Sequence, residues 1–257
     1  MNNGPSRNVI RVAIVGDFQI GKSSLVNCLL AESAAEVGEG YFPTTEEAGE
    51  FPFSSGVVLV DTPGFDDTRT ELTKQSEEQI GSADAVLFVK TDKILGDRDE
   101  RILCLAGRKP QIVVFNCWDR THGRRGWIPE LPENKETCAT IRSELERSGM
   151  GDSVLHIEGN PVCAVNVLWA QFGLGLDISN EQRDDIVAFA KTKLGLALDE
   201  NALRAEMLCR SGFLPVRAFL TNLPLELLKH ATANPQWEID RIVDCFAENL
   251  RVRWSAA

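Results

Sequence analysis

The sequence predicts an α/β fold with three layers, in which a mostly parallel sheet is covered by helices on both faces. Short apolar runs of strand length alternate along the chain with longer segments of helical period. Parallel strands need such crossover connections, whereas antiparallel neighbours need only tight turns. The composition agrees, because 257 residues that are 43% hydrophobic and 25% charged can bury a sizeable core.

The predicted strands are short and apolar, and they lie at 9–16, at 51–61 as a hairpin, at 84–90, at 111–116 and within 156–166. The predicted helices between them lie at 22–31, 71–83, 97–107 and 133–149. The segment 32–50 has no clear period and is predicted to be a loop.

The chain turns helical after residue 166. The further helices are predicted at 181–197, 200–212, 215–223 and 237–254. Pro224 and the pair Asn234–Pro235 interrupt this pattern. One α/β domain is therefore predicted over residues 1–223, followed by a short C-terminal helical extension over 224–257.

Charge and composition exclude several classes of protein. The formal net charge is −11, and Lys and Arg form no concentrated run, so no nucleic-acid partner is expected and a strongly anionic membrane is disfavoured. The chain has no apolar run of 18 residues and no secretory signal, which predicts a cytoplasmic protein. Its seven cysteines have no paired spacing, which disfavours a zinc site and a disulfide framework.

The segment Gly16–Ser23 fits the phosphate-binding pattern GxxxxGK[ST], directly after a strand and at the start of a helix. Its glycines allow the backbone to curl so that successive amides point at phosphate oxygens. Lys22 supplies a positive charge to the β- and γ-phosphates, and the Ser23 hydroxyl is a ligand for Mg²⁺. The predicted nucleotide contacts of this segment are Asp17, Phe18, Gln19, Ile20, Gly21, Lys22, Ser23 and Ser24.

A second motif, Asp61-Thr62-Pro63-Gly64, ends an apolar strand. An acidic residue at this place beside a phosphate loop holds Mg²⁺ through water. Asp61 is therefore a predicted metal residue. Gly64 is predicted to sense the γ-phosphate through its amide and is counted with the catalytic residues.

A third motif, Asn116-Cys117-Trp118-Asp119, matches the guanine-specificity pattern NKxD with cysteine in place of lysine. The Asp119 carboxylate can accept hydrogen bonds from guanine N1–H and the 2-amino group. Adenine lacks that donor pair, so it would leave the carboxylate unsatisfied. Asn116 is expected to brace this loop against the phosphate loop, while Cys117 covers the base less well than a lysine stem.

Two weaker elements complete the predicted site. Thr45, or alternatively Thr44, is predicted to reach Mg²⁺ from the loop at 32–50. Cys163, Ala164 and Val165 are predicted to follow the last strand, where a backbone amide contacts the guanine oxygen.

Taken in order, GDFQIGKSS, PTT, DTPGF, NCWD and CAV resemble the motifs of translation-factor-related P-loop GTPases over residues 9–166. The phosphate loop and the TT/DTPG pair are most similar to the Era, MnmE, septin and bacterial dynamin-like branch. The segment RSGFLPVRAFL resembles the closing helix of that family. The resemblance implies GTP or GDP with Mg²⁺, a GTPase switch, and a homodimer with GTP as an open alternative.

Two residues depart from the motifs of related GTPases. Phe65 stands where Ras-type enzymes carry a glutamine that orients the attacking water, so slow intrinsic hydrolysis is expected without help from a partner or cation. Gln19 stands where potassium-using relatives carry asparagine, which leaves K⁺ activation open. The alternatives are a GTP-gated binding or assembly module with little turnover and a membrane-associated dynamin-like GTPase. The effector or activating protein is not identified by the sequence.

Other polar and aromatic residues are given structural interpretations. Asp66, Asp67, Asp97 and Asp99 are expected to be solvated carboxylates at helix starts. The isolated histidines form no pattern of nucleophile and base. The helix at 237–254 is amphipathic and is expected to pack back on the domain, with a partner or membrane surface as the alternative.

Overall fold

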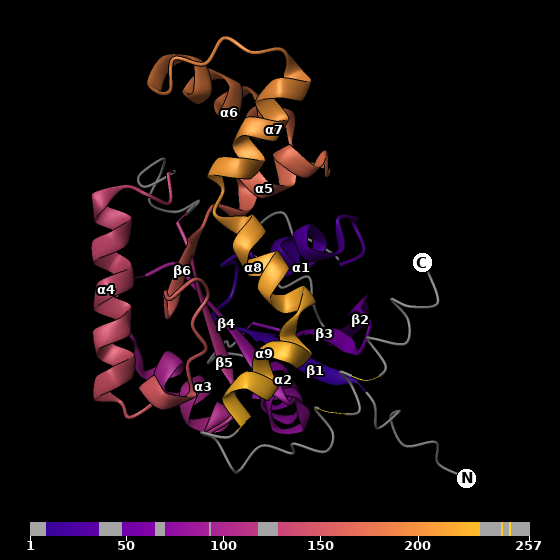
Figure 1. Cartoon of the computed structure of the whole chain (residues 1–257), viewed down its shortest axis with the longest axis vertical. Coiled ribbons are helices and arrows are strands. Elements are labelled where there is room, and N and C mark those ends of the chain that lie inside the picture. The colour runs from indigo at the N-terminus through magenta and orange to yellow at the C-terminus, as the bar shows by residue number, and fades with distance from the viewer. Residues whose placement is uncertain are drawn as a thin grey trace.

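The computed structural model describes residues 9–35, 48–64, 70–92, 94–117 and 128–231, together with residues 243 and 247. Within these ranges a six-stranded sheet has the order β2-β3-β1-β4-β5-β6 (Figure 1). Its strands are β1 (Ile10–Val15), β2 (Gly49–Ser54), β3 (Val57–Asp61), β4 (Ala85–Lys90), β5 (Gln111–Asn116) and β6 (Val162–Val165). Among these strands only the β2–β3 pair is antiparallel. The predicted α/β class and mostly parallel sheet are confirmed.

The central strands owe their position to their composition. β1, β4 and β5 are runs of apolar residues that are almost entirely buried. Strands of this kind lie inside parallel sheets, where helices cover both faces. β1 pairs with β3 on one side and β4 on the other, so Val12 lies between Leu59 and Ala85. The loop after β1 therefore leaves from the middle of the sheet.

Helices cover both faces of the sheet and divide the core into two clusters. One cluster joins alternate residues of the central strands, such as Ile14, to α1 (Lys22–Leu30). The other joins the opposite residues, such as Ala13, to the remaining crossover helices. Those helices are α2 (Thr70–Ser82), α3 (Asp97–Ala106) and α4 (Pro132–Arg147), and a short 3-10 helix η1 (Gly151–Ser153) follows α4.

Three helices after β6 form a unit with a core of its own. They are α5 (Val167–Leu174), α6 (Asn180–Lys193) and α7 (Glu200–Arg210), and they stand at one end of the molecule (Figure 1). Trp169, Phe172 and Met207 are buried in their shared cluster. Sequence reasoning missed α5, because this helix is apolar on nearly all sides and shows no amphipathic period.

The last described helices return to the sheet. α8 (Phe213–Thr221) and α9 (Leu223–Ala231) bury Phe213 and Leu227 in the same cluster as β1. Pro224 is the second residue of α9, where a proline needs no hydrogen bond for its nitrogen. Residues 223 and 224 therefore lie together in α9, and the division into a domain over 1–223 and an extension over 224–257 stays a prediction. The helix predicted at 237–254 lies outside the described residues except for Val243 and Ala247, which are helical.

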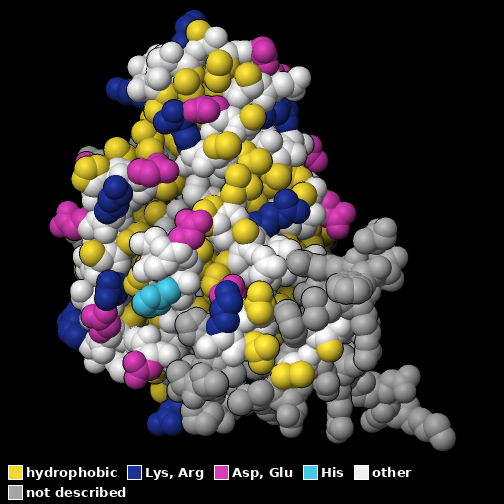
Figure 2. Space-filling model, in the orientation of Figure 1, with side chains coloured by type: hydrophobic (Ala, Val, Ile, Leu, Met, Phe, Trp, Pro, Cys, Tyr) yellow, Lys and Arg dark blue, Asp and Glu magenta, His cyan; other side chains and the backbone are white. Residues whose placement is uncertain are grey.

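On the face drawn in Figure 2, Lys and Arg side chains are interspersed with Asp and Glu, and hydrophobic side chains gather over α7 and α8. No helix among the described residues has both the length and the apolar character needed to cross a bilayer.

Candidate nucleotide-binding site

The predicted motifs lie at one edge of the sheet. β1, β3, β5 and β6 run parallel, so their carboxyl ends meet there. The loop Gly16–Gly21 leaves β1 at this edge, and Thr62, Asn116 and Asn166 follow or end the other strands. In open α/β sheets this edge is where ligands bind.

The backbone of the loop after β1 depends on two glycines. Gly16 has φ of +146°, and a Cβ there would lie 2.4 Å from the Val89 carbonyl oxygen. Gly21 has φ of +91° as the N-cap of α1, and its Cβ would lie 2.9 Å from Asn116 Nδ2. Only glycine fits both the conformation and the space at these positions. The loop is therefore wrapped tightly around the start of α1.

Lys22 is buried at the first position of α1 and turns its ammonium group into the loop. Its Nζ donates hydrogen bonds to the carbonyl oxygens of Gly16, at 3.2 Å, and Asp17, at 2.7 Å. Burial lowers the pKa of Lys22 to about 8, and the nearby carboxylates of Asp61 and Asp17 partly oppose that shift. An ammonium held in this way is suited to pair with an anionic group such as a phosphate, which would favour its charged form.

Ser23 and Asp61 meet beside Lys22. The Ser23 hydroxyl donates to Asp61 Oδ2 at 2.7 Å, while Asp61 Oδ1 is buried and has no hydrogen-bond partner within the described part of the chain. Burial raises the pKa of Asp61, and the Ser23 bond and the Lys22 charge act against that rise. A hydroxyl and a carboxylate with a spare buried oxygen form a donor set that suits Mg²⁺. These residues therefore fit the metal that the sequence predicts.

Gly64 lies directly against the phosphate loop. A Cβ at Gly64 would lie 2.8 Å from the Phe18 Cα, so a larger residue would collide with the loop backbone. The preceding Thr62 fixes the segment by donating its hydroxyl to the Ile14 carbonyl oxygen at 2.7 Å. The structure thus brings the second motif next to the first.

Asn116 joins three segments at the end of β5. Its Nδ2 donates to the Ile20 carbonyl oxygen at 3.0 Å, and its Oδ1 accepts from the Val167 backbone amide at 3.3 Å. The first bond is the brace that the sequence predicts. Cys117 follows in a buried position, its backbone amide donates to the Val165 carbonyl oxygen at 2.9 Å, and burial raises the pKa of its thiol.

Cys163, Ala164 and Val165 differ in place from the prediction. They belong to β6 and pair with Val114, Phe115 and Asn116, rather than following the strand. α5 begins almost at once, because Asn166 caps it by accepting from the Trp169 amide at 3.0 Å. Burial raises the pKa of the Cys163 thiol to about 12. Their contact with guanine stays a prediction.

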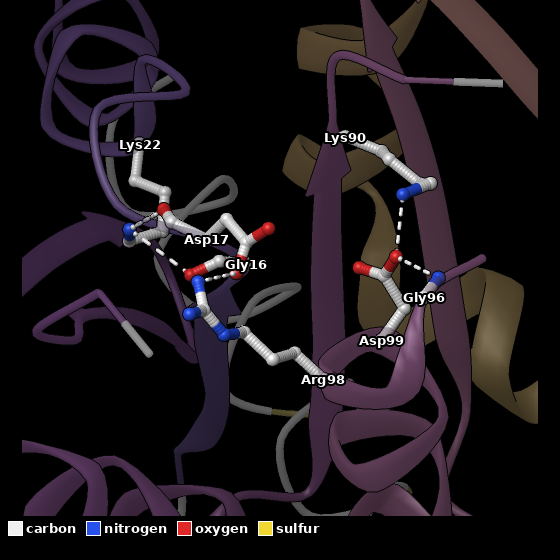
Figure 3. A network of polar contacts seen from close by, with 7 residues as sticks. All are labelled: Gly16, Asp17, Lys22, Lys90, Gly96, Arg98 and Asp99. Carbon is white, nitrogen blue, oxygen red and sulfur yellow. Dashed lines mark hydrogen bonds and ion pairs between the residues drawn. The ribbon is translucent and has the colours of Figure 1, made fainter. Parts of the chain in front are cut away.

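A charged network behind the phosphate loop was not predicted (Figure 3). Lys90 Nζ lies 2.5 Å from Asp99 Oδ2, both side chains are buried, and that oxygen also accepts from the Gly96 amide. The expectation that Asp99 is solvated is therefore wrong, while Asp97 is exposed as expected. A lysine that ends the apolar strand β4, followed by an aspartate in the first turn of the next helix, was the available signal.

A separate ion pair joins α3 to the phosphate loop through Arg98. Its Nη1 lies 3.6 Å from Asp17 Oδ1, so the Asp17 side chain faces α3 (Figure 3). Burial and the nearby Asp99 raise the pKa of Asp17, and Arg98, Lys90 and Lys22 oppose the rise. The loop is thus supported from α1, β5 and α3.

Gln19 is exposed and has a positive φ of 59° at the tip of the loop. Thr44, Thr45, Phe65, Asp66, Asp67, Trp118 and Asp119 lie outside the described residues, so their predicted roles stay predictions.

This arrangement of loop, lysine, serine and strand-end aspartate defines a P-loop nucleotide-binding protein. Residues 11–117 match the family model described as "50S ribosome-binding GTPase". The chain is 33% identical over 156 residues to the tRNA modification GTPase MnmE of Lactobacillus johnsonii, a match that covers 58% of this chain and 34% of that protein. With MnmE of Lacticaseibacillus paracasei it is 35% identical over 143 residues, covering 53% and 29%.

A crystal structure of Aquifex aeolicus Era bound to GDP and AlF4⁻ aligns with a TM-score of 0.44 and 22% identity, over 71% of this chain and 57% of that one. That score is too low to support an assignment, which depends on the sequence matches. The chain spans about a third of the length of the MnmE proteins that it matches. By sequence it is similar to P-loop GTPases of the MnmE type.

Proposed function

We propose that this chain binds GTP and GDP with Mg²⁺ and hydrolyses GTP slowly, as a nucleotide-dependent switch. The observation that carries the proposal is the meeting of Ser23 and Asp61, 2.7 Å apart, with a spare buried oxygen on Asp61 beside the Lys22 ammonium. Those groups are what a triphosphate and its metal require, and the family match indicates the nucleotide.

Each residue has a separate task in the proposed reaction. When nucleotide binds, the Lys22 ammonium replaces a hydrogen bond to a loop carbonyl oxygen with hydrogen bonds to phosphate oxygens, and its positive charge stabilises the negative charge that develops on them. Ser23 and Asp61 would hold Mg²⁺, directly and through water, with Thr45 completing the set, and the metal would supply positive charge beside the phosphates. Gly64 reports the γ-phosphate, because its backbone is already packed on the loop.

The base is proposed to be held at the other end of the loop. Asp119 accepts from guanine, and a backbone amide within 163–165 donates to its oxygen. Asn116 keeps the base loop and phosphate loop in register through its bond to the Ile20 carbonyl oxygen. Cys117 leaves one side of the base less covered than a lysine would.

Single-turnover hydrolysis of γ-labelled GTP with Mg²⁺, in sodium and in potassium, tests the proposal. We expect slow phosphate release from the wild type, strong loss in Ser23→Asn, and no change in the control Ser143→Ala, whose hydroxyl is exposed on α4. Faster release in potassium would indicate that Gln19 contributes to a cation site. Unchanged release from Ser23→Asn would contradict the metal assignment.

A GTP-gated binding or assembly module with little turnover is the second candidate, favoured by Phe65 in place of a water-orienting glutamine. Gel filtration with GDP and then with a non-hydrolysable GTP analogue, in both salts, separates the candidates when combined with the turnover data. Dimerisation with the analogue and no phosphate release would support the module. The names of the MnmE relatives include tRNA modification. The match covers about a third of their length, so we propose no such role for this chain.

A further inference from the structure

The junction between α7 and α8 lies directly on the end of β6. A Cβ at Gly212 would lie 2.3 Å from the Ala164 carbonyl oxygen, so the two backbones are in contact. The Asn166 amide donates to the Ser211 carbonyl oxygen at 2.8 Å. The contacts fall on both sides of Val165: Ala164 belongs to the segment predicted to face guanine, and Asn166 directly follows it. This junction is not part of any nucleotide-binding motif.

The same end of β6 is tied to the phosphate loop. The Cys117 amide donates to the Val165 carbonyl oxygen, and the first amide of α5, that of Val167, donates to Asn116 Oδ1. Asn116 in turn donates to the Ile20 carbonyl oxygen. A continuous series of hydrogen bonds therefore runs from the phosphate loop, through the base-recognition residues, to the start of the α5–α7 unit.

The junction is itself a fixed support. Ser211 and Phe213 are fully buried, the Ser211 hydroxyl donates to the Leu208 carbonyl oxygen at 2.6 Å, and the Phe213 amide donates to that hydroxyl at 3.2 Å. Phe213 belongs to the sheet core, whereas Leu203 and Met207 of α7 belong to the core of the helical unit. The junction thus connects the two cores at the point where it contacts β6.

We propose that the Ser211–Gly212 junction is a positioning element for guanine recognition, which holds the end of β6 against the base and links the base site to the α5–α7 unit. This inference rests on the proposed function. Ser211 and Gly212 act as positioning residues and not as catalytic ones, through the backbone of Ala164 and Asn166.

Two glycines provide a matched pair of variants. Gly212 has φ of +70° and is blocked by the Ala164 oxygen. Gly195 has φ of +67°, and a Cβ there would meet no atom of the described residues within 4 Å beyond its chain neighbours. Alanine introduces similar backbone strain at both positions. Only Gly212→Ala also displaces β6, so differences between Gly212→Ala and Gly195→Ala report the contact and not the strain.

The affinities of GDP, ADP and pyrophosphate, each with Mg²⁺, are to be measured for both variants and the wild type. We expect Gly212→Ala to lower the affinity for GDP by about tenfold or more, since small displacements of a positioned group have large effects. The preference for GDP over ADP, measured as the ratio of their affinities, should also decrease. Pyrophosphate affinity should not change, because it engages the phosphate loop alone. Gly195→Ala should match the wild type with all three ligands.

Two results would overturn the inference: equal losses of GDP and pyrophosphate in Gly212→Ala, or identical behaviour of the two variants. A wild type that binds no guanine nucleotide would overturn the proposed function together with the inference. A wild type that binds GDP while Gly212→Ala behaves as Gly195→Ala would overturn the inference alone.

Amide hydrogen exchange on the wild type supplies a test that needs no variant, in case Gly212→Ala fails to fold. GDP should slow exchange at the Asn166 and Phe213 amides, which hydrogen-bond within the junction, and pyrophosphate should not. Equal protection by the two ligands, or none by GDP, would overturn the inference.

Discussion

The proposed phosphate end and the proposed base end of the site are built in different ways. The phosphate end gathers Gly16, Lys22, Ser23 and Asp61 from one loop and one neighbouring strand, and its parts are charges and glycine conformations. The base end depends on backbone contacts among β5, β6, α5 and the α7–α8 junction. In the proposed site, the groups for phosphate therefore come from neighbouring segments, whereas recognition of the base would depend on how distant segments pack. Variants at the two ends should therefore have separable effects.

Lys22→Ala should have the largest effect, because it removes the positive charge at the phosphate end. We expect the affinity for GDP to fall by about a hundredfold or more, since charged groups form the stronger contacts to phosphate. The ligand-free protein should lose little stability, because the lysine is buried at a cost that its lowered pKa reports. Titration calorimetry and thermal unfolding measure both quantities.

The control for that variant is Lys229→Ala, whose ammonium is exposed and paired with Glu226 within α9. It should bind GDP as the wild type does. Wild-type affinity in Lys22→Ala would contradict the assignment of the phosphate end.

Asp61→Asn should separate the metal from the rest of the phosphate end. We expect the stimulation of GTP binding by Mg²⁺ to fall by about tenfold or more, because a neutral amide attracts Mg²⁺ and its bound water less strongly than a carboxylate does. GDP binding in EDTA should change little. The exposed Asp97→Asn is the control, and equal Mg²⁺ dependence in both variants would refute the metal role.

Asn116→Ala should affect both ends at once. It removes partners from the Ile20 carbonyl and the Val167 amide, which are 96 and 51 residues away along the chain. Leaving two buried groups unsatisfied should cost about 2–4 kcal/mol of unfolding free energy, and GDP and pyrophosphate affinities should fall together. Denaturant titration measures the loss of unfolding free energy. The control is Asn160→Ala, since the Asn160 side chain is exposed and donates a long bond at 3.4 Å; equal costs would show that the brace contributes nothing.

The smallest effect is a pH dependence. The pKa of Lys22 is lowered from 10.5 to about 8 in the fold, so the free protein loses this proton as the pH rises through 8. Phosphate binding favours the charged form, so GDP affinity should fall several-fold between pH 7 and 8.5, with proton uptake on binding. Over the window from about 8 to 10.5 the unfolded state binds more protons, so this group makes the free protein more stable as the pH rises.

Calorimetry in buffers of different ionisation enthalpy measures the proton uptake, and the chosen range stays below the pH at which guanine itself ionises. A pH-independent affinity would show that Lys22 remains protonated without nucleotide.

The contrast between the two ends also explains what the sequence could predict. The strands, the crossover helices and the phosphate loop follow from contiguous patterns, so β1, α1 and the Ser23–Asp61 site were accessible to sequence reasoning. α5 was missed because an apolar helix has no period, and the buried state of Asp99 was missed because Lys90 belongs to another element. The Gly212 contact was inaccessible, because nothing near Gly212 in the sequence points to Ala164.

The most direct test of guanine recognition is competition of unlabelled GTP and ATP against a fluorescent guanine nucleotide on the wild-type protein with Mg²⁺. We predict that GTP displaces the probe at concentrations about a hundredfold or more lower than ATP, since a site that pairs with a specific hydrogen-bond pattern rejects a base that lacks it. Equal displacement by GTP and ATP would contradict the base end of the site, and displacement by neither would contradict nucleotide binding itself.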